Sequence, residues 1–278
     1  MLRARILSAV VLIPVVLILL ILGPETTALT TGIAAIIGAY EFYHMSEHSP
    51  YHFHPLVIPG YIAAAAFSLA AYLKAPLWLL GIILLLAVLT LPYYWYSQRN
   101  QPATTPSSEA QPLGKYGSWL ITIFAPVYVG LPLALIALIR RPSTDASIWW
   151  VVLICIGTWG ADTGGYAFGR LFGRHKLAPK ISPKKTWEGA VGGVLTAMIG
   201  VALVGGLALN IPLYLTLPLG FVLAVGSILG DLFESWAKRR FDTKDSGKLI
   251  PGHGGLLDRI DSFLVVTILT YIFILFYS

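Results

Sequence analysis

The chain has 278 residues, of which 56% are hydrophobic and only 12% are charged, and its net charge is +6. Soluble proteins carry about 25% charged residues, so the composition excludes an ordinary soluble domain and predicts a polytopic membrane protein. The single cysteine, Cys155, cannot form an intrachain disulfide. The basic residues gather in loops between apolar runs, which indicates membrane topology and phosphate-bearing ligands and no nucleic acid partner.

Apolar runs long enough to cross a bilayer define the predicted helices, because a spanning helix needs about 20 mostly apolar residues. We count nine such runs, at residues 5–23, 28–44, 56–73, 76–96, 119–139, 147–168, 189–208, 211–234 and 259–277. No small-residue cleavage site follows the first run, so we expect a retained helix and not a signal peptide. The predicted fold is therefore all-α, a polytopic integral membrane helical bundle.

A polar stretch at residues 97–118 divides the chain. It is rich in Pro, Ser, Thr and Gln, which is typical of a flexible linker, here predicted to be cytoplasmic. It separates an N-terminal transmembrane region, residues 1–96 with about four helices, from a region at 119–278 with about five. Most of the 13 acidic residues lie in the second region, so we expect the chemistry there.

The distribution of Lys and Arg predicts the topology. With the N-terminus in the cytoplasm, the predicted outer segments contain only Lys74, Arg140 and Arg141 of the 19 basic residues. This asymmetry follows the positive-inside rule, to which Arg140 and Arg141 are the exception. Two late basic loops contribute much of the inner excess, so functional charge adds to the topological signal.

Two further patterns have plain structural interpretations. Gly192, Thr196 and Gly200 recur every four residues on one predicted helix, and this small-residue spacing predicts close helix packing. The four histidines His44, His48, His52 and His54 would suit a metal site only on a continuous helix. Because Pro50 interrupts that helix, we interpret them as part of a solvated interfacial loop.

One carboxylate pair precedes the polar segment at residues 235–261 and a second lies at its end. Asp231 and Glu234 lie three residues apart at the predicted end of one helix, and Asp258 and Asp261 have the same spacing at the start of the next. Converging carboxylates repel one another unless a cation lies between them, and an all-oxygen ligand set beside phosphate suits Mg²⁺ or Mn²⁺. Helix capping is the alternative for Asp258 and Asp261, since acids are favoured in a first helical turn.

The loop between these pairs combines positive charge with glycines. Lys238, Arg239, Lys244 and Lys248 supply the charge, and Gly252, Gly254 and Gly255 surround His253. Glycines let backbone N–H groups approach a ligand closely, so the loop suits a polyphosphate. The alternative is a positive-inside loop that binds only lipid headgroups.

A second basic segment lies upstream, between two predicted helices. Ser182, Lys184, Lys185 and Thr186 offer two hydroxyls and two cations to phosphate oxygens, although the Walker spacing is absent. Asp162, in the apolar run before it, is expected to face the bundle interior. Taken alone, structural and functional interpretations of this segment remain equally open.

Residues 235–261 closely resemble the signature of the phosphatidate cytidylyltransferase (CDP-diacylglycerol synthase) family. The matching positions are Ser235, Lys238, Arg239, Lys244, Asp245, Gly247, His253, Gly254, Gly255, Asp258, Arg259 and Asp261. Ala237 departs from the pattern, standing where the family has a larger apolar residue. The S-P-K-K-T-W-E-G segment from Ser182 also looks like this family, and the resemblance is specific over roughly residues 155–265.

The resemblance implies that CTP and phosphatidic acid react to give CDP-diacylglycerol and pyrophosphate, with Mg²⁺ or Mn²⁺ as cofactor. The implied metal ligands are Asp231, Asp258 and Asp261. The implied catalytic residues are Asp231, Lys238, Arg239, Lys244, Asp245, His253, Asp258 and Asp261. The implied substrate-binding residues are Ser182, Lys184, Lys185, Thr186, Ser235, Gly254, Gly255 and Arg259.

The expected setting is the lipid bilayer of a bacterial-type inner (cell) membrane, with the site facing the cytoplasm and the chain a homodimer. Two other functions fit parts of the sequence. A CTP-dependent lipid or polyprenol kinase would transfer the γ-phosphate instead. An ion-coupled transporter would use Asp162 and Asp231 as an ion path, but most of the acids lie at one interface and not at the bilayer midplane.

Overall fold

The computed structural model describes residues 14, 18–20, 22–73, 75–99, 116–141, 144–249 and 254–277. The regular structure in these ranges is almost entirely helical, as the composition predicts. The helices are α2 (Pro24–Glu47), α3 (Val57–Tyr72), α4 (Pro76–Arg99), α5 (Gly117–Arg140), α6 (Asp145–Phe172), α7 (Trp187–Ala208), α8 (Leu213–Arg240) and α9 (Leu257–Tyr277). The predicted helix at 5–23 and most of the predicted linker at 97–118 fall outside the described residues.

Long apolar helices make this chain an integral membrane protein. Within the described ranges, six helices are long and apolar enough to cross a membrane: Pro76–Tyr96, Gly117–Arg140, Asp145–Phe172, Trp187–Ala208, Leu213–Arg240 and Leu257–Tyr277. Helix α3 is a shorter apolar helix of 16 residues. The polytopic helical fold predicted from hydropathy is confirmed.

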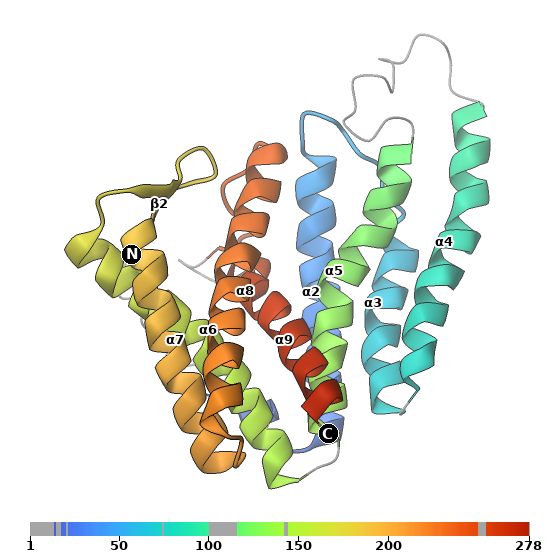
Figure 1. Ribbon diagram of the computed structural model, residues 1–278. Helices are drawn as coiled ribbons and strands as arrows, with labels where there is room; N and C mark the ends of the chain where they lie inside the picture. Colours follow the sequence, from blue (N-terminus) through green and yellow to red (C-terminus); the bar gives the residue numbers. More distant parts are fainter. Residues whose placement is uncertain are drawn as a thin grey trace. The chain divides into compact units, whose positions relative to one another are not determined.

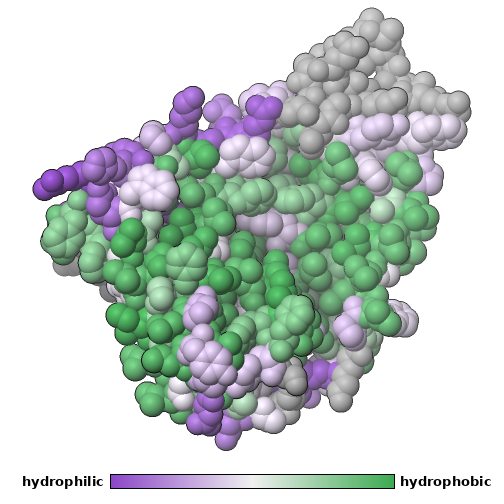
Figure 2. Space-filling model, in the orientation of Figure 1, coloured by the Kyte–Doolittle hydropathy of each residue, from purple (hydrophilic) through white to green (hydrophobic). Residues whose placement is uncertain are grey.

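Helix α7 has its bulky apolar residues on one side and its small residues on the other. Its large apolar side chains are exposed at four-residue intervals, at Val191, Leu195, Ile199, Leu203 and Leu207. Its buried side instead contains glycines, alanine and valine. Lipid is as apolar as a leucine side chain, so the helix gains little by burying leucine and packs through its small residues. Figure 2 shows hydrophobic surface along these helices and hydrophilic residues over the hairpin beyond them.

The chain packs as two compact units. Unit 1 comprises Met1–Leu138 with Arg240–Asp258, and unit 2 comprises Ile139–Arg239 with Arg259–Ser278. The division at the linker stays a prediction, because it concerns sequence regions and not packing.

Unit 2 is built on closely packed helices. Helices α6, α7 and α8 lie side by side (Figure 1), and Ala161, Ala197 and Ala224 are buried where they meet. A Cβ atom on Gly193 would lie 2.5 Å from the Ala161 carbonyl oxygen, so only glycine permits this approach. A Cβ atom on Gly192 would collide with the Phe168 side chain of α6. The close packing predicted from the small residues of α7 is confirmed.

A short antiparallel hairpin precedes α7 in unit 2. Strand β1 (Lys176–Ala178) pairs with β2 (Ser182–Thr186), and Lys176 stands opposite Thr186 in the register. The hairpin extends beyond the N-terminal end of α7 (Figure 1). The basic segment expected to be an irregular loop is therefore a β-strand, which holds its side chains in a defined alternation.

Unit 1 packs α3, α4 and α5 through a small-residue core. Phe67, Ala70, Leu79, Ala134 and Ala137 are among its buried members. Polar side chains also join the helices of this unit, including Tyr43, whose hydroxyl donates to the Thr122 carbonyl oxygen at 2.7 Å. Side chains in hydrocarbon need such internal partners because no water is present.

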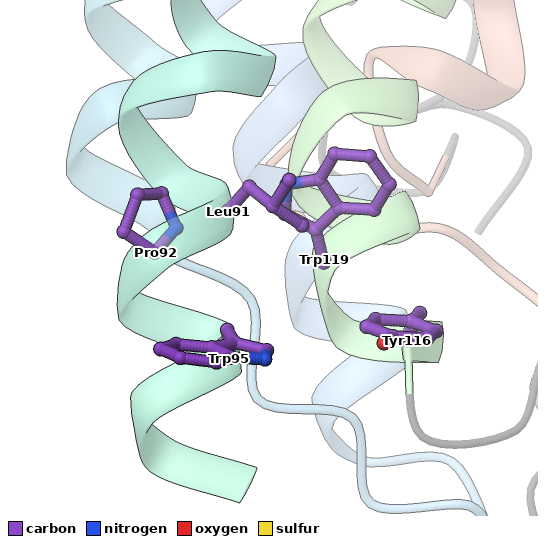
Figure 3. Close-up of a pocket in the computed structure, with 5 residues that line it drawn as sticks. All are labelled: Leu91, Pro92, Trp95, Tyr116 and Trp119. Atoms are coloured by element: carbon purple, nitrogen blue, oxygen red, sulfur yellow. The ribbon is translucent and has the colours of Figure 1, made fainter.

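An apolar groove of about 520 Å³ lies between α4 and α5 in unit 1. Its walls are Leu91, Pro92, Trp95, Tyr116 and Trp119 (Figure 3). Aromatic residues of this kind near helix ends are typical of a membrane interface. None of these five described wall residues carries a charge.

Two predictions about helix ends need correction. Helix α2 continues to Glu47 with His48 as its C-cap, so His44 lies on the helix, while His52, with φ 46°, and His54 lie in the loop. Helix α8 continues to Arg240, six residues beyond the predicted end. Arg140, an exception to the charge rule, is buried and donates to the Ser147 hydroxyl, so it stabilises the α5–α6 connection.

Candidate functional site

The acidic pair on α8 lies inside the helix and not at its end. Because α8 continues to Arg240, Asp231 is about two and a half turns before the C-terminus. The negative end of the helix dipole, which disfavours acids, therefore lies beyond these carboxylates. Lys238 and Arg239, predicted in the following loop, also belong to this helix.

The basic strand β2 and the acidic part of α8, which are separate in the sequence, meet in unit 2. Lys185, on β2, forms an ion pair of 2.6 Å with Asp231 on α8, and both side chains are partly shielded from solvent. The Ser235 hydroxyl, one turn further along α8, donates to the other oxygen of Asp231 at 3.1 Å. The hairpin strand thus places a cation directly on the acidic face of α8.

Three carboxylates share this region of unit 2. Asp162 on α6 interacts electrostatically with Asp231, and Asp231 with Asp261 on α9. Asp261 is buried and accepts a hydrogen bond from the Ser262 backbone N–H at 2.7 Å. Asp162 is exposed to solvent, and the charges that act on it lie on α8, β2 and α9. Lys185 and Arg259 supply positive charge near Asp162, so the cluster combines acids with cations.

Close approach of α8 and α9 brings Asp231 near Asp261. A Cβ atom on Gly230 would lie 2.9 Å from the Asp261 carbonyl oxygen and 3.0 Å from the Ser262 Cα. Only glycine at this position lets the two backbones come so near. Asp231, the next residue along α8, consequently lies within electrostatic range of Asp261.

The second acid of the α8 pair has a different environment. Glu234 is 1% exposed and forms an ion pair with Lys238, four residues later on the same helix. A buried carboxylate is expensive without such a partner. Lys238, predicted to act on substrate phosphate, thus also neutralises a buried acid. Arg239 beside it is exposed.

The end of the hairpin is fixed by capping. Thr186 is buried and is the N-cap of α7, its hydroxyl accepting from the Gly189 N–H at 3.1 Å. Glu188 accepts backbone hydrogen bonds from Arg174 and His175 and pairs with the His175 ring at 2.6 Å. Thr186 therefore has a structural role that its predicted substrate contact did not include, and Ser182 is half-buried while Lys184 is exposed.

The glycine-bearing loop of the signature belongs to unit 1. Gly254 has φ +88°, a conformation that favours glycine, and a Cβ atom there would lie 2.6 Å from Asp258 Oδ2. Asp258 Oδ2 accepts from the backbone N–H groups of Ser246 at 3.0 Å and Gly255 at 2.8 Å. Asp258 thus lies in the first turn of α9, where the dipole favours an acid, and its hydrogen bonds fix the preceding loop. Lys244 and Asp245 are exposed, and His253 lies outside the described residues.

Glu41 is a residue that the sequence analysis missed. It lies on α2, is 2% exposed, and contacts the signature loop through Ser246, Leu256 and Leu257. A charged residue inside a predicted membrane helix is the signal that could have identified it. Its position in the N-terminal region, where we expected no chemistry, hid that signal.

Metal-binding potential differs between the two clusters. Among the described residues, the group whose ligand atoms all lie within 4.8 Å of one another is His44, Glu47 and His48. Asp162, Asp231 and Asp261 do not form so tight a group in the described ranges. They supply carboxylate oxygens only, the donors that Mg²⁺ and Mn²⁺ prefer.

Comparison with known proteins extends these observations. The sequence matches the cytidylyltransferase family over residues 3–277. It is 48% identical over 118 residues to the phosphatidate cytidylyltransferase of Staphylococcus saprophyticus, covering 42% of this chain and 45% of that protein. It is 40% identical over 146 residues to the phosphatidate cytidylyltransferase of Brucella suis, covering 52% and 54%. The chain thus spans about half the length of the curated relatives it matches. Because the family match runs over almost the whole chain, this protein belongs to the cytidylyltransferase family.

Proposed function

We propose that this protein is a phosphatidate cytidylyltransferase, which transfers CMP from CTP to phosphatidic acid. The observation that carries the proposal is the Lys185–Asp231 ion pair of 2.6 Å, in a unit of membrane helices that also holds Asp162 and Asp261. Acids for a divalent cation and bases for phosphate are thereby combined in one membrane-embedded unit. The names of the two bacterial relatives support the choice of lipid substrate.

The reaction needs positioning more than a strong base. A phosphate monoester has a second pKa of about 6, so the phosphatidate phosphate is already ionised near neutral pH. One of its oxygens forms a new bond to the α-phosphorus of CTP, and the bond from that phosphorus to the β-phosphate oxygen breaks. Pyrophosphate leaves with the electron pair. The protein must hold two polyanions in line and offset their repulsion.

Basic side chains of this chain perform that task. In unit 2, Lys184, Lys185 and Arg259 offer positive charge to phosphate oxygens, and Ser182 adds a hydroxyl. In unit 1, Lys244 is exposed on the signature loop, and Gly254, with φ +88°, turns the backbone of the same loop before Gly255. Lys185 already contacts a carboxylate, so an arriving phosphate would compete with Asp231 for its ammonium group.

The acidic residues of unit 2 fit a divalent cation. Asp231 and Asp261 interact with each other and with Asp162, and this repulsion favours a bound cation. Asp231 and Asp261 would hold Mg²⁺ or Mn²⁺, while Asp258 stays a sequence prediction, since one of its oxygens accepts two backbone hydrogen bonds. When bound, the cation neutralises charge on the nucleotide phosphates and on the leaving pyrophosphate.

The proposal includes a setting for the enzyme. The site faces the cytoplasm of a bacterial-type inner membrane, where CTP is available, and phosphatidic acid reaches it laterally from the bilayer. The charge asymmetry between the two predicted sides supports this orientation. A homodimer is part of the proposal and rests on the family resemblance alone.

Product analysis tests the proposed function. Purified protein in detergent is given phosphatidic acid and CTP labelled at the α-phosphorus, with and without Mg²⁺. We expect label in the lipid only with Mg²⁺, together with release of pyrophosphate. Transfer of a γ-label to lipid would instead identify a CTP-dependent kinase. Folded protein that transfers neither label would reject both and leave the ion-coupled transporter as the alternative.

A further inference from the structure

Glu41 makes an unusual set of contacts for a glutamate on a membrane-region helix. Its Oε2 accepts from the Ser246 hydroxyl at 3.0 Å and from the Leu257 N–H at 2.8 Å, and its Oε1 accepts from the Leu256 N–H at 2.8 Å. The carboxylate is 2% exposed. One buried side chain therefore bonds to the signature loop, the segment between α8 and α9, at Ser246 within it and at Leu256 where it ends.

These contacts give the backbone N–H groups at the start of α9 a hydrogen-bond acceptor. The first N–H groups of a helix have no partner inside the helix, and an anion nearby is also favoured by the dipole. Helix α9 begins at Leu257, so Glu41 supplies acceptors at this end from 216 residues earlier in the chain. The loop does not form this N-terminus alone and depends on α2 for an acceptor.

Two glycines of the signature adjoin the same carboxylate. A Cβ atom on Gly247 would lie 2.7 Å from Glu41 Oε1, and one on Gly255 would collide with Oε2. Small residues at these positions leave room for the Glu41 head group. Ser246 joins the two networks, because its hydroxyl donates to Glu41 while its N–H donates to Asp258 Oδ2.

We infer that Glu41 is a positioning residue, which holds the signature loop in the conformation needed for reaction. It touches no reacting atom and acts through Ser246 and through the backbone that leads into Asp258. This inference rests on the proposed function for its consequence on turnover. Its consequence for loop order does not depend on any reaction.

The test is Glu41→Gln, which keeps the shape but replaces one acceptor oxygen with an NH₂ group that faces backbone donors. We expect kcat to fall roughly 10- to 100-fold with KM for CTP changed far less, because a displaced loop misplaces groups in the transition state. We also expect faster trypsin cleavage after Lys244 or Lys248, which are exposed on this loop. Glu25→Gln, on the exposed first turn of the same helix, is the matched control and should change neither property.

Ser246→Ala provides a second variant if Glu41→Gln fails to fold. It removes one donor to Glu41, and its effect on cleavage should be smaller and should not add to that of Glu41→Gln, as expected for groups in one network. Unchanged cleavage and unchanged kcat in both variants would overturn the inference. Wild-type protein that transfers no label would reject the proposed function, whereas the trypsin comparison would still decide the role of Glu41.

An independent observation at the end of α2 concerns the sequence H-M-S-E-H at residues 44–48. His44 and His48 are exposed, Glu47 is half-buried, and one ligand atom of each lies within 4.8 Å of the others. The two imidazole centroids are 4.1 Å apart. Continuation of the helix to Glu47 creates this arrangement, since residues four apart share a helix face.

The hydrogen bonding of His48 suits a metal ligand. Its Nδ1 lies 2.9 Å from the His44 carbonyl oxygen. A carbonyl oxygen only accepts, so Nδ1 carries the proton and Nε2 keeps its lone pair for another partner. Ligating histidines typically donate their second ring N–H to a carbonyl in this way. We propose that His44, Glu47 and His48 bind a transition-metal ion, with Zn²⁺ matching this nitrogen and oxygen ligand set.

Zinc titration with a competing chromogenic chelator tests this site, with excess Mg²⁺ present to occupy the carboxylate cluster. We expect wild-type protein to bind one Zn²⁺ that His44→Gln/His48→Gln protein does not bind. The matched control, His52→Gln/His54→Gln, removes the same number of histidines from the adjacent loop and should retain the ion. Equal zinc binding by all three proteins, or none by the wild type, would overturn the assignment.

Discussion

At the scale of single residues, the ion pair between Lys185 and Asp231 joins the hairpin to helix α8. The pair is partly shielded and measures 2.6 Å, so it is more than an exposed surface ion pair. Lys185 can neutralise Asp231 or bind a substrate phosphate. Under the proposed reaction, the same cation would stabilise the resting unit and then act on substrate.

Lys185→Met tests this dual role. Under the proposed reaction, we expect turnover to fall by about 100-fold or more, as for loss of one group that stabilises transition-state charge. The assay is label transfer from α-labelled CTP at saturating substrate. Lys180→Met, at the exposed turn of the same hairpin, is the control and should keep normal turnover. Equal activity of both variants would remove Lys185 from the site.

Asp261→Asn tests the buried acid. The substitution keeps the shape and removes one negative charge from the cluster, so the protein should insert and fold while metal-dependent turnover falls about 100-fold or more. The measurement is turnover as a function of Mg²⁺ concentration. Asp145→Asn, in the exposed first turn of α6, should leave the Mg²⁺ dependence unchanged. An unaltered Mg²⁺ dependence in Asp261→Asn protein would contradict a metal role.

At the scale of helices, glycine positions control how near the backbones come. Gly230→Ala places a methyl group against backbone atoms of α9 at 2.9 and 3.0 Å, and backbone cannot rotate away as a side chain can. We expect a loss of about 1–3 kcal/mol in unfolding free energy, as for overpacking, and lower turnover as Asp231 and Asp261 separate. Thermal unfolding in detergent measures the first effect and label transfer the second.

Gly81→Ala is the control for that substitution. Gly81 lies in the interior of α4 with nothing within 4 Å of a Cβ atom. Alanine favours a helix by about 1 kcal/mol over glycine, so this variant should unfold at an equal or higher temperature. If Gly230→Ala behaved like Gly81→Ala, close contact of α8 with α9 would not limit stability.

Hydropathy predicted the helices well because lipid imposes one requirement on every span. The structure has helices at each predicted run from 28–44 onward, with ends that differ by a few residues. The main error was α8, where the polar residues Lys238 to Arg240 continue the helix beyond its apolar part. Hydropathy detects the apolar part of a helix and does not detect a helix that continues into water.

The side-chain partners were harder to predict than the helices. The sequence identified Asp231 in an acidic segment and Lys185 in a basic segment. Their contact depends on how the hairpin folds onto α8, which neither segment reveals alone. Glu41 was missed because its partners lie more than 200 residues away, and no local pattern encodes that contact. Thr186 was assigned to substrate because a hydroxyl that caps a helix looks the same in sequence as one that binds phosphate.

At the scale of the whole molecule, the charge asymmetry predicts which ends of the helices face the cytoplasm. Lys180, in the hairpin, and Asp145, at the other end of α6, are predicted on opposite sides of the membrane. Cys155 is buried and is the single cysteine of the chain, so it gives little background to thiol labelling.

Labelling of cysteines introduced at these positions tests the topology. We expect Lys180→Cys to react with an impermeant reagent only in inside-out vesicles, and Asp145→Cys only in intact cells whose outer surface is accessible. Wild-type protein measures the background from Cys155. Reaction of both positions from the same side would contradict the predicted topology and the cytoplasmic location of the hairpin.

The dependence of the signature loop on Glu41 has a consequence for biosynthesis. Glu41 leaves the ribosome 215 residues before Leu256, its backbone donor. At about 5–20 residues per second, translation takes roughly 10–40 s to supply that partner. During this interval a carboxylate destined for burial must remain hydrated, protonated or bound to another group. The hydrogen bonds from Leu256 and Leu257 to Glu41 are therefore among the last contacts of unit 1 to form. Chains released before residue 256 cannot form them.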